Sequence, residues 1–322
     1  MREHRSCWAS EGYNTGVKLK KILVLGGSYF LGRVYTMLAS EENELTLFNR
    51  GNFKVNIEGV TEICGDRKRT EDLKRIPEAH YDAVVDFCAY EEGDIELGLS
   101  GAKFSADQYI YISTVDVCAP VPYEPGLMKT EDFRTGLPSG DDAQSRYVRN
   151  KLLLEREIRR VATEKNIGYT ILRPAVLYGP FNYAPREPEL IKQMVRSRAL
   201  FLPENSSRLY SFCYVKDAAL ITLALTANEQ AYGQSYNLAG PAANAEDVAT
   251  ALMAACAVPV KRYHFSEELL EKRGIPVVFA GTLEESQVYD GTKASRAASV
   301  EYISLAEGMT RTYRAFENIY AE

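Results

Sequence analysis

Histidine clusters, paired cysteines and long apolar runs are absent from this chain of 322 residues. Its three histidines lie far apart, which argues against a zinc site. The six cysteines are scattered without a C-x-x-C pair, as expected for free thiols in a reduced, cytoplasmic protein. No apolar run approaches the roughly 18 residues that a membrane span needs. Residues 1–17 lack an apolar signal core, so we expect a disordered extension or a misassigned start.

A surplus of positive charge is also missing. The formal net charge is -6, which gives no support for a general nucleic-acid binder, although it does not exclude local basic patches. The hydrophobic fraction of 46% and charged fraction of 25% are those of an ordinary globular protein. A chain of this length can form one large domain or two lobes. The expected partner is a small-molecule substrate, and a homodimer is left open.

The stretch from residue 20 to 33 reads KKILVLGGSYFLGR and predicts a strand, a glycine turn and a helix. Such a turn lets backbone N–H groups and a helix N-terminus face a pyrophosphate. The spacing Gly26-x-x-Tyr29-x-x-Gly32 lacks the middle glycine of the dinucleotide fingerprint. A plain strand-to-helix turn is the alternative. The residues expected against a dinucleotide are Gly26, Gly27, Ser28, Tyr29, Phe30 and Leu31.

Later strand ends supply further candidates for the same cofactor. The strand at residues 44–48 ends at Asn49 and Arg50, where an uncharged residue and a guanidinium favour the 2′-phosphate of NADP over NAD. Arg50 as a solvated turn residue is the alternative. Strand 61–64 leads to Asp66 and Arg67; Asp66 is either an acceptor for the adenine amino group or a turn aspartate. Small residues such as Ala89 after strand 83–87 would let a cofactor lie close.

Strands alternating with helical segments at this rhythm predict βαβ units and a doubly wound parallel α/β sheet. Strand 109–112 carries Ser-Thr to its C-terminal tip, where ligands of such sheets gather. Residues 116–145 have little periodicity and several prolines, which indicates an active-site loop or a disordered insert. Residues 145–165 are predicted to form a long helix.

Three residues form the catalytic hypothesis. Tyr147 and Lys151 lie four residues apart in the predicted helix, so phenol and ammonium share one face. The ammonium is expected to lower the tyrosine pKa, while Thr114 holds the substrate oxygen beside the phenol. About one Y-x-x-x-K is expected by chance, and a second does occur at Tyr289 and Lys293. That one contains Asp-Gly, a turn signal, so its ends need not share a helical face.

From about residue 20 onward, the chain resembles an extended short-chain dehydrogenase/reductase of the NAD-dependent epimerase/dehydratase type. The resemblance rests on LGGSYFLGR, LTLFNRG, ISTVDV and the Tyr147/Lys151 motif in that order. It implies Thr114, Tyr147 and Lys151 as a catalytic triad that acts with NAD or NADP. The LGG-x-x-FLG variant is similar to an atypical bacterial subgroup and to chloroplast stem-loop-binding proteins.

The resemblance also implies a substrate region in the second half. Strand 169–172 runs into Arg173-Pro174, and the loop with Pro174 is expected near the nicotinamide. Val176 stands where sugar epimerases commonly carry asparagine. In the segment YSFCYVKD, Tyr210 replaces an arginine that holds a nucleotide diphosphate. Arg208, two residues earlier on an extended strand, either substitutes for it or is a solvated loop arginine.

These inferences combine into one prediction. Residues 18–175 are expected to form the dinucleotide-binding domain and residues 176–322 mainly a smaller substrate lobe, with segments that cross between them. Further strands and helices are predicted at 234–238, 218–227, 247–257 and 305–320. The expected activity is hydride transfer to or from a carbonyl or alcohol of a sugar-like substrate, with or without an attached nucleotide. Val115-Asp116 lacks the Asp-Glu pair of dehydratases, which favours epimerisation or reduction. The rival is a non-catalytic or RNA-binding member of the same fold.

Overall fold

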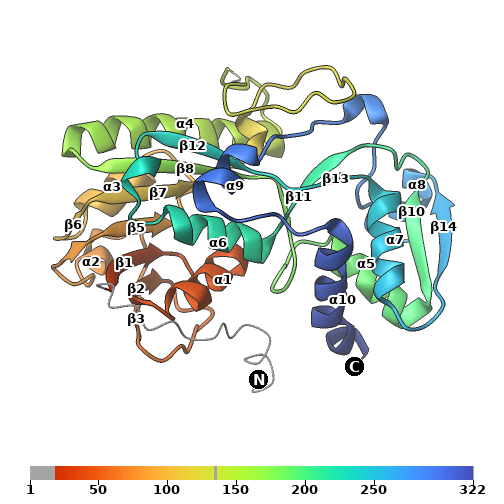
Figure 1. The fold of residues 1–322 in the computed structure, drawn as a ribbon, viewed down its shortest axis with the longest axis horizontal. Helices are drawn as coiled ribbons and strands as arrows, with labels where there is room; N and C mark the ends of the chain where they lie inside the picture. The colour runs from red at the N-terminus through yellow and green to blue at the C-terminus, as the bar shows by residue number, and fades with distance from the viewer. Residues whose placement is uncertain (1–18, 134–135, 322) are drawn as a thin grey trace.

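The computed structural model describes residues 19–133 and 136–321, so the predicted extension at residues 1–17 lies outside the described residues. Its larger unit is built on a parallel sheet of seven strands (Figure 1), which confirms the predicted α/β class. In sheet order the strands are β12 (Gln234–Leu238), β8 (Gly168–Pro174), β7 (Gln108–Ile112), β5 (Ala83–Asp86), β1 (Lys20–Leu25), β2 (Asn43–Asn49) and β3 (Val60–Cys64).

The order of the strands places the crevice of the sheet. From β1 the chain adds β2 and β3 on one side, then β5, β7, β8 and β12 on the other. The order therefore reverses beside β1, and ligands of open α/β sheets bind at the carboxyl ends of the strands near such a reversal. The central strands β1 and β5 carry buried apolar runs, at residues 22–25 and 83–85, because helices cover both faces of the sheet.

Two helical layers cover these faces (Figure 1). One core beside the sheet includes side chains from the helices α2 (Thr70–Leu73), α3 (Asp94–Ser100) and α4 (Ala143–Lys165). The opposite core includes side chains from α1 (Phe30–Ala39), α6 (Val215–Leu225) and α9 (Thr292–Ala298). Because α6, α9 and β12 follow residue 175, the chain returns to the larger unit after entering the smaller lobe.

The smaller lobe has its own apolar core between three helices, α5 (Glu187–Ser197), α7 (Ala245–Ala255) and α10 (Leu305–Ala321). Beside them β10 (Ala199–Pro203) pairs in parallel with β14 (Lys261–Phe265), next to α8 (Glu267–Lys272). A sheet of β13 (Ala242–Ala243), β11 (Tyr210–Tyr214) and β9 (Val176–Tyr178) runs between the two units in Figure 1. The remaining pair is β4 (His80–Tyr81) with β6 (Ser105–Ala106).

One buried carboxylate ties α6 to the segment before α10. Asp217 lies in the first turn of α6 and accepts a hydrogen bond from the Ile303 N–H at 2.9 Å. Burial raises the pKa of Asp217 to about 6, although the Ile303 hydrogen bond opposes this shift. The carboxylate therefore carries a charge that the folded protein stabilises poorly near neutral pH.

The predicted loop at residues 116–145 is attached to the C-terminal half of the chain. It begins at the short turn η2 (Val115–Val117) and leads into α4. The Lys129 N–H donates to the Val288 carbonyl at 2.8 Å, and the Asp290 N–H donates to the Lys129 carbonyl at 3.0 Å. Two further short turns are η3 (Glu229–Ala231) and η4 (Leu283–Glu285). Within the described residues, no helix combines the length and apolarity that a bilayer crossing requires.

Candidate functional site

Three glycines shape the turn between β1 and α1. Gly26 has φ +100°, in the region that favours glycine. A Cβ added to Gly27 would lie 2.5 Å from Leu47 Cδ1, and one added to Gly32 would lie 2.9 Å from the Gly27 Cα. The absence of side chains therefore lets α1 pack directly against the turn, as a dinucleotide fingerprint requires.

Tyr29 occupies the position of the missing middle glycine without strain in its own backbone. Its backbone is extended, with φ -123° and ψ 141°. Its ring packs edge-on against Phe53 and Tyr183, with centroid distances of 4.4 and 5.4 Å. Helix α1 has no side-chain cap and no acidic residue in its first turn, so its first N–H groups can bind an anion. The turn fits the pyrophosphate of a dinucleotide.

A single cavity of about 1270 Å³ joins this turn to the smaller lobe. Of the predicted site residues, those that line it are Gly26, Gly27, Ser28, Tyr29, Phe30, Leu31, Asn49, Arg50, Asp66, Arg67, Thr114, Tyr147, Lys151, Pro174, Val176, Arg208 and Tyr210. Ala89 is buried and is not part of this lining; its carbonyl oxygen faces Lys151 Nζ at 3.4 Å.

Thr114 and Tyr147 meet at the carboxyl end of β7. Thr114 is buried, and its Oγ1 accepts a hydrogen bond from the Asp116 N–H at 3.2 Å. Tyr147 lies near the start of α4 with 40% of its surface exposed. Burial raises the pKa of Tyr147, the Asp116 carboxylate raises it further, and a hydrogen bond with Thr114 opposes the shift. The predicted fall in this pKa is therefore wrong for the free protein.

The position of Lys151 explains why the ammonium does not lower the pKa of that phenol. Lys151 Nζ donates to the Ile112 carbonyl at 2.9 Å and lies 6.0 Å from the centroid of the Tyr147 ring. It also lies 5.1 Å from the centroid of the Tyr111 ring. Burial lowers the pKa of Lys151 to about 8, against the attraction of the Asp86 carboxylate. The lysine is still mostly protonated at neutral pH.

A buried ion pair that the sequence analysis missed holds these catalytic candidates in place. Arg173 donates from Nε and Nη2 to the two carboxylate oxygens of Glu155, at 2.8 and 2.7 Å. The Ser113 hydroxyl donates to the same carboxylate at 2.7 Å. These contacts fasten α4 to the ends of β7 and β8. Glu155 follows Lys151 by four residues, so the helical spacing that selected Tyr147 and Lys151 could also have found it.

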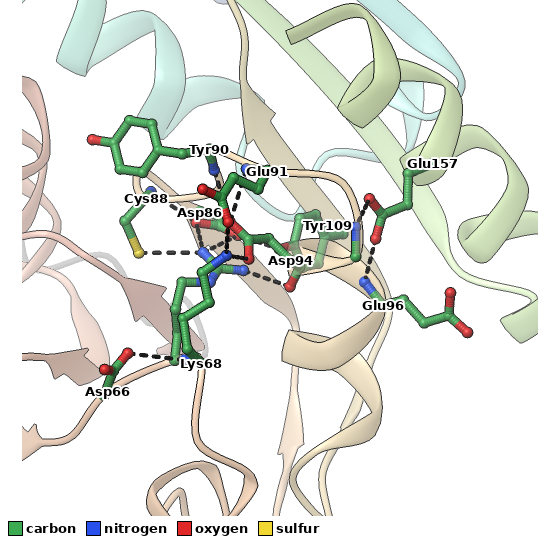
Figure 2. A network of polar contacts seen from close by, with 12 residues as sticks. Asp66, Lys68, Asp86, Cys88, Tyr90, Glu91, Asp94, Glu96, Tyr109 and Glu157 are labelled. Atoms are coloured by element: carbon green, nitrogen blue, oxygen red, sulfur yellow. Dashed lines mark hydrogen bonds and ion pairs between the residues drawn. The ribbon is translucent and has the colours of Figure 1, made fainter. Parts of the chain in front are cut away.

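Arg67, predicted to contact the cofactor, is mainly engaged inside the fold. Its Nη1 lies 2.7 and 2.8 Å from the two carboxylate oxygens of Asp86, and its Nη2 donates to the Asp94 carbonyl at 2.6 Å. The Tyr109 hydroxyl donates to the same Asp86 carboxylate. Figure 2 shows polar contacts gathered around Asp86 and Asp94, with Asp66 at the edge of the network. The guanidinium is thus neutralised before any ligand binds.

The same network anchors the start of α3 (Figure 2). Lys68 Nζ lies 2.6 Å from an oxygen of Asp94, whose other oxygen accepts from the Tyr90 N–H at 2.9 Å. Glu157, on α4, accepts from the N–H groups of Gly93 and Glu96, each at 2.7 Å. Glu157 thereby caps a helix that has no side-chain cap of its own.

The side chains at the predicted ribose end differ in whether other residues of the protein already bind them. Asn49 is buried and folds back on its own turn, accepting from the Gly51 N–H at 2.6 Å and donating to Glu62 at 3.1 Å. Arg50 is exposed, and its guanidinium makes no hydrogen bond or ion pair within residues 19–133 and 136–321. Asp66 accepts from the Lys68 N–H at 2.9 Å, as a turn aspartate does.

At the other end of the cavity, Arg208 and Tyr210 lie together as the strand spacing predicts. The Arg208 guanidinium lies 4.9 Å from the centroid of the Tyr210 ring, and its buried Nε has no partner among the described residues. The Tyr210 hydroxyl donates to the Ala280 carbonyl at 2.5 Å. Val176 pairs through its backbone with Phe212, which joins β9 to β11.

The second Y-x-x-x-K does separate its two ends. Tyr289 is buried and lines the cavity, whereas Lys293, on α9, donates to the Ser235 carbonyl at 2.9 Å. Only the pair at Tyr147 and Lys151 shares a helical face beside the glycine turn.

Sequence comparison identifies a family over part of the chain. Residues 97–239 match the NAD dependent epimerase/dehydratase family. Over these residues the match supports the family predicted from the motifs, and the LGG-x-x-FLG subgroup stays a prediction. A curated relative, the chloroplast stem-loop binding protein of 41 kDa b from Arabidopsis thaliana, is 28% identical over 238 residues. That alignment covers 69% of this chain and 59% of the relative, so the chain spans less than two thirds of its length.

Solved epimerase structures share the fold over nearly the whole chain. The epimerase Mth375 from Methanothermobacter thermautotrophicus is 18% identical, with a TM-score of 0.74 and 94% of each chain covered. A UDP-glucuronic acid 4-epimerase from Bacillus cereus, solved with UDP-glucuronic acid and NAD, is 20% identical with a TM-score of 0.70. This match covers 93% of the present chain and 100% of the other. At these identities the likeness supports the epimerase-type fold.

Proposed function

We propose that the chain is an NAD(P)-dependent enzyme that moves hydride to or from a carbonyl or alcohol of a sugar-like substrate. The observation that carries the proposal is that Thr114, Tyr147 and Lys151 line the same cavity as the glycine turn. The turn at residues 26–31 would hold the pyrophosphate, with Arg50 and Asp66 at the adenosine end. The nicotinamide ring supplies the hydride chemistry.

Each catalytic side chain has a role that follows from its surroundings. The raised pKa keeps Tyr147 protonated in the free protein, so its hydroxyl can donate a proton to a developing alkoxide. In the opposite direction the phenolate takes the proton from an alcohol. Thr114, which hydrogen-bonds the phenol, orients the substrate oxygen. Lys151 is fixed by the Ile112 carbonyl and would hold the ribose hydroxyls.

The net reaction proposed is epimerisation or reduction rather than dehydration. Asp116 lines the cavity, but Val115 beside it is buried, so the acidic pair expected of a dehydratase is incomplete. A nucleotide-linked sugar is the favoured substrate. Arg208, with its unpartnered Nε, supplies a positive group at the far end of the cavity, and a similar fold in B. cereus was solved with UDP-glucuronic acid.

A second candidate is a member that binds RNA and does not catalyse. The name of the A. thaliana relative, a stem-loop binding protein, favours it. The net charge of -6 and the presence of both Tyr147 and Lys151 oppose it.

Mass spectrometry of the ligand that copurifies with the full chain, followed by fluorescence titration with NAD(H) and NADP(H), separates the two functions. We expect a bound nicotinamide dinucleotide, or saturable binding of one after the ligand is removed. Absorbance due to copurified RNA, with no binding of either dinucleotide, would favour the second function.

A further inference from the structure

Tyr289 lies in the substrate end of the cavity and plays no part in the mechanism described above. It is 8% exposed and lines the cavity together with Arg208 and Lys129. Its backbone is fixed on both sides. The Tyr289 N–H donates to the Ser211 hydroxyl at 3.0 Å, and a β-bridge pairs the residue with Lys129. These contacts fix the backbone from which the side chain enters the cavity lining.

The hydroxyl of Tyr289 has a proton left to donate. Lys129 Nζ lies 4.4 Å from the centroid of the ring and donates to the phenolic oxygen at 3.3 Å. Within the described residues no hydrogen bond takes the proton of that hydroxyl. Burial raises the pKa of Tyr289, so the phenol stays protonated and acts as a donor. An ammonium that donates to the oxygen polarises the O–H bond and strengthens this donor.

Within the described residues, no carboxylate makes a direct contact with the Lys129 side chain. It is 2% exposed, and its other hydrogen bonds go to neutral oxygens, Gln287 Oε1 at 2.7 Å and the Ala119 carbonyl at 3.2 Å. Burial lowers the pKa of Lys129. Asp116, the acidic side chain that acts on both Lys129 and Tyr289, is exposed and accepts from Gln144 at 3.3 Å. A buried cation of this kind is stabilised when an anion binds beside it.

We propose that Tyr289, with Lys129 behind its ring, anchors an anionic group of the substrate, either a phosphate or a sugar carboxylate. The buried Nε of Arg208, which has no partner among the described residues, supplies a second donor to the same end of the cavity. This inference rests on the proposed function in that the cavity is a substrate site, but it requires neither hydride transfer nor a particular cofactor.

Calorimetric titration of the full chain with pyrophosphate, UDP-glucose and UDP-glucuronate tests the anchor. Tyr289→Phe removes only the hydroxyl, and Lys129→Met removes the charge. Tyr263→Phe, at an exposed position on β14, is the matched control. A hydrogen bond to a charged group is worth about tenfold or more in affinity. We expect a loss of that size in Tyr289→Phe and Lys129→Met and none in Tyr263→Phe.

The pattern of losses identifies the anionic group. An equal loss for all three ligands indicates a phosphate, and a loss confined to UDP-glucuronate indicates the sugar carboxylate. Unchanged affinity in Tyr289→Phe, or no binding of any of the three by the wild type, would overturn the inference. NAD(H) and NADP(H) titrations on the same samples report separately on the proposed function, because the dinucleotide site begins at the opposite end of the cavity. Tyr289→Phe leaves Lys129 in place, so the test stands even where Lys129→Met fails to fold.

Discussion

Replacing Asp86 with asparagine should destabilise the protein strongly, because it leaves the buried Arg67 without its counter-charge. Asparagine keeps the size of the side chain and removes the carboxylate that accepts from Arg67 and Tyr109. Both partners of the ion pair are nearly inaccessible, with side-chain exposures of 9% and 0%. Breaking a buried pair by removing one partner costs about 3–5 kcal/mol.

The expected loss translates into a measurable melting shift. At roughly 2.1 cal/mol/K per residue, unfolding of this chain has an entropy of about 0.7 kcal/mol/K, so the loss corresponds to about 4–7 °C. Differential scanning calorimetry or denaturant titration measures it. Asp107→Asn is the matched control, because Asp107 contacts His80 Nε2 at 3.0 Å in a surface pair in which both side chains are 55% exposed. A surface pair contributes about 0–1 kcal/mol.

The result that would refute this reasoning is a loss in Asp86→Asn no larger than that in Asp107→Asn. Arg67 would then be free to face a ligand, as the sequence analysis expected. A large loss instead assigns Arg67 to the scaffold and leaves Asp66 as the side chain of this loop that faces the adenosine end.

Three further predictions concern single side chains. Tyr147→Phe should lower turnover by about 10² to 10⁴ while dinucleotide affinity is unchanged, and turnover close to wild type would remove the phenol from the mechanism. Arg50→Ala should weaken NADP(H) by about tenfold or more, because a guanidinium–phosphate contact is lost; tighter binding of NAD(H) by the wild type would contradict this. Asp217→Asn should stabilise the protein at neutral pH by about 1–3 kcal/mol, because the raised pKa of about 6 means that stability falls as pH rises from about 4 to about 6. Denaturant titrations at pH 4.5 and 7.5 should therefore show the gain mainly at the higher pH, and an equal effect at both would refute it.

The sequence predicted best those features that local periodicity specifies. The glycine turn, the strand tip at Thr114 and the helix with Tyr147 and Lys151 each lie within a short window, and a parallel sheet carries its strand ends to one edge. The position of Tyr29 in the turn could not be predicted from the fingerprint, because only the extended backbone and the neighbouring rings show how a bulky residue fits.

Contacts between segments far apart in the chain could not be predicted from the sequence. Arg67 and Asp86 are 19 residues apart on different strand ends, and nothing in either motif indicates that they pair. The prediction of a lowered Tyr147 pKa was wrong for the same reason. Helical spacing places Lys151 on the same face as Tyr147, but the Ile112 carbonyl determines where the ammonium points. In the smaller lobe, α5, β10, β14 and α8 were not predicted, because their packing depends on partners far along the chain.

A crystal structure of the wild-type chain with NAD(H) or NADP(H) tests the central claim most directly. The account predicts the pyrophosphate against the N–H groups of residues 27–31 and the nicotinamide ribose within hydrogen-bond distance of Tyr147 and Lys151. A dinucleotide bound outside the cavity, or one whose nicotinamide lies far from Tyr147, would contradict it.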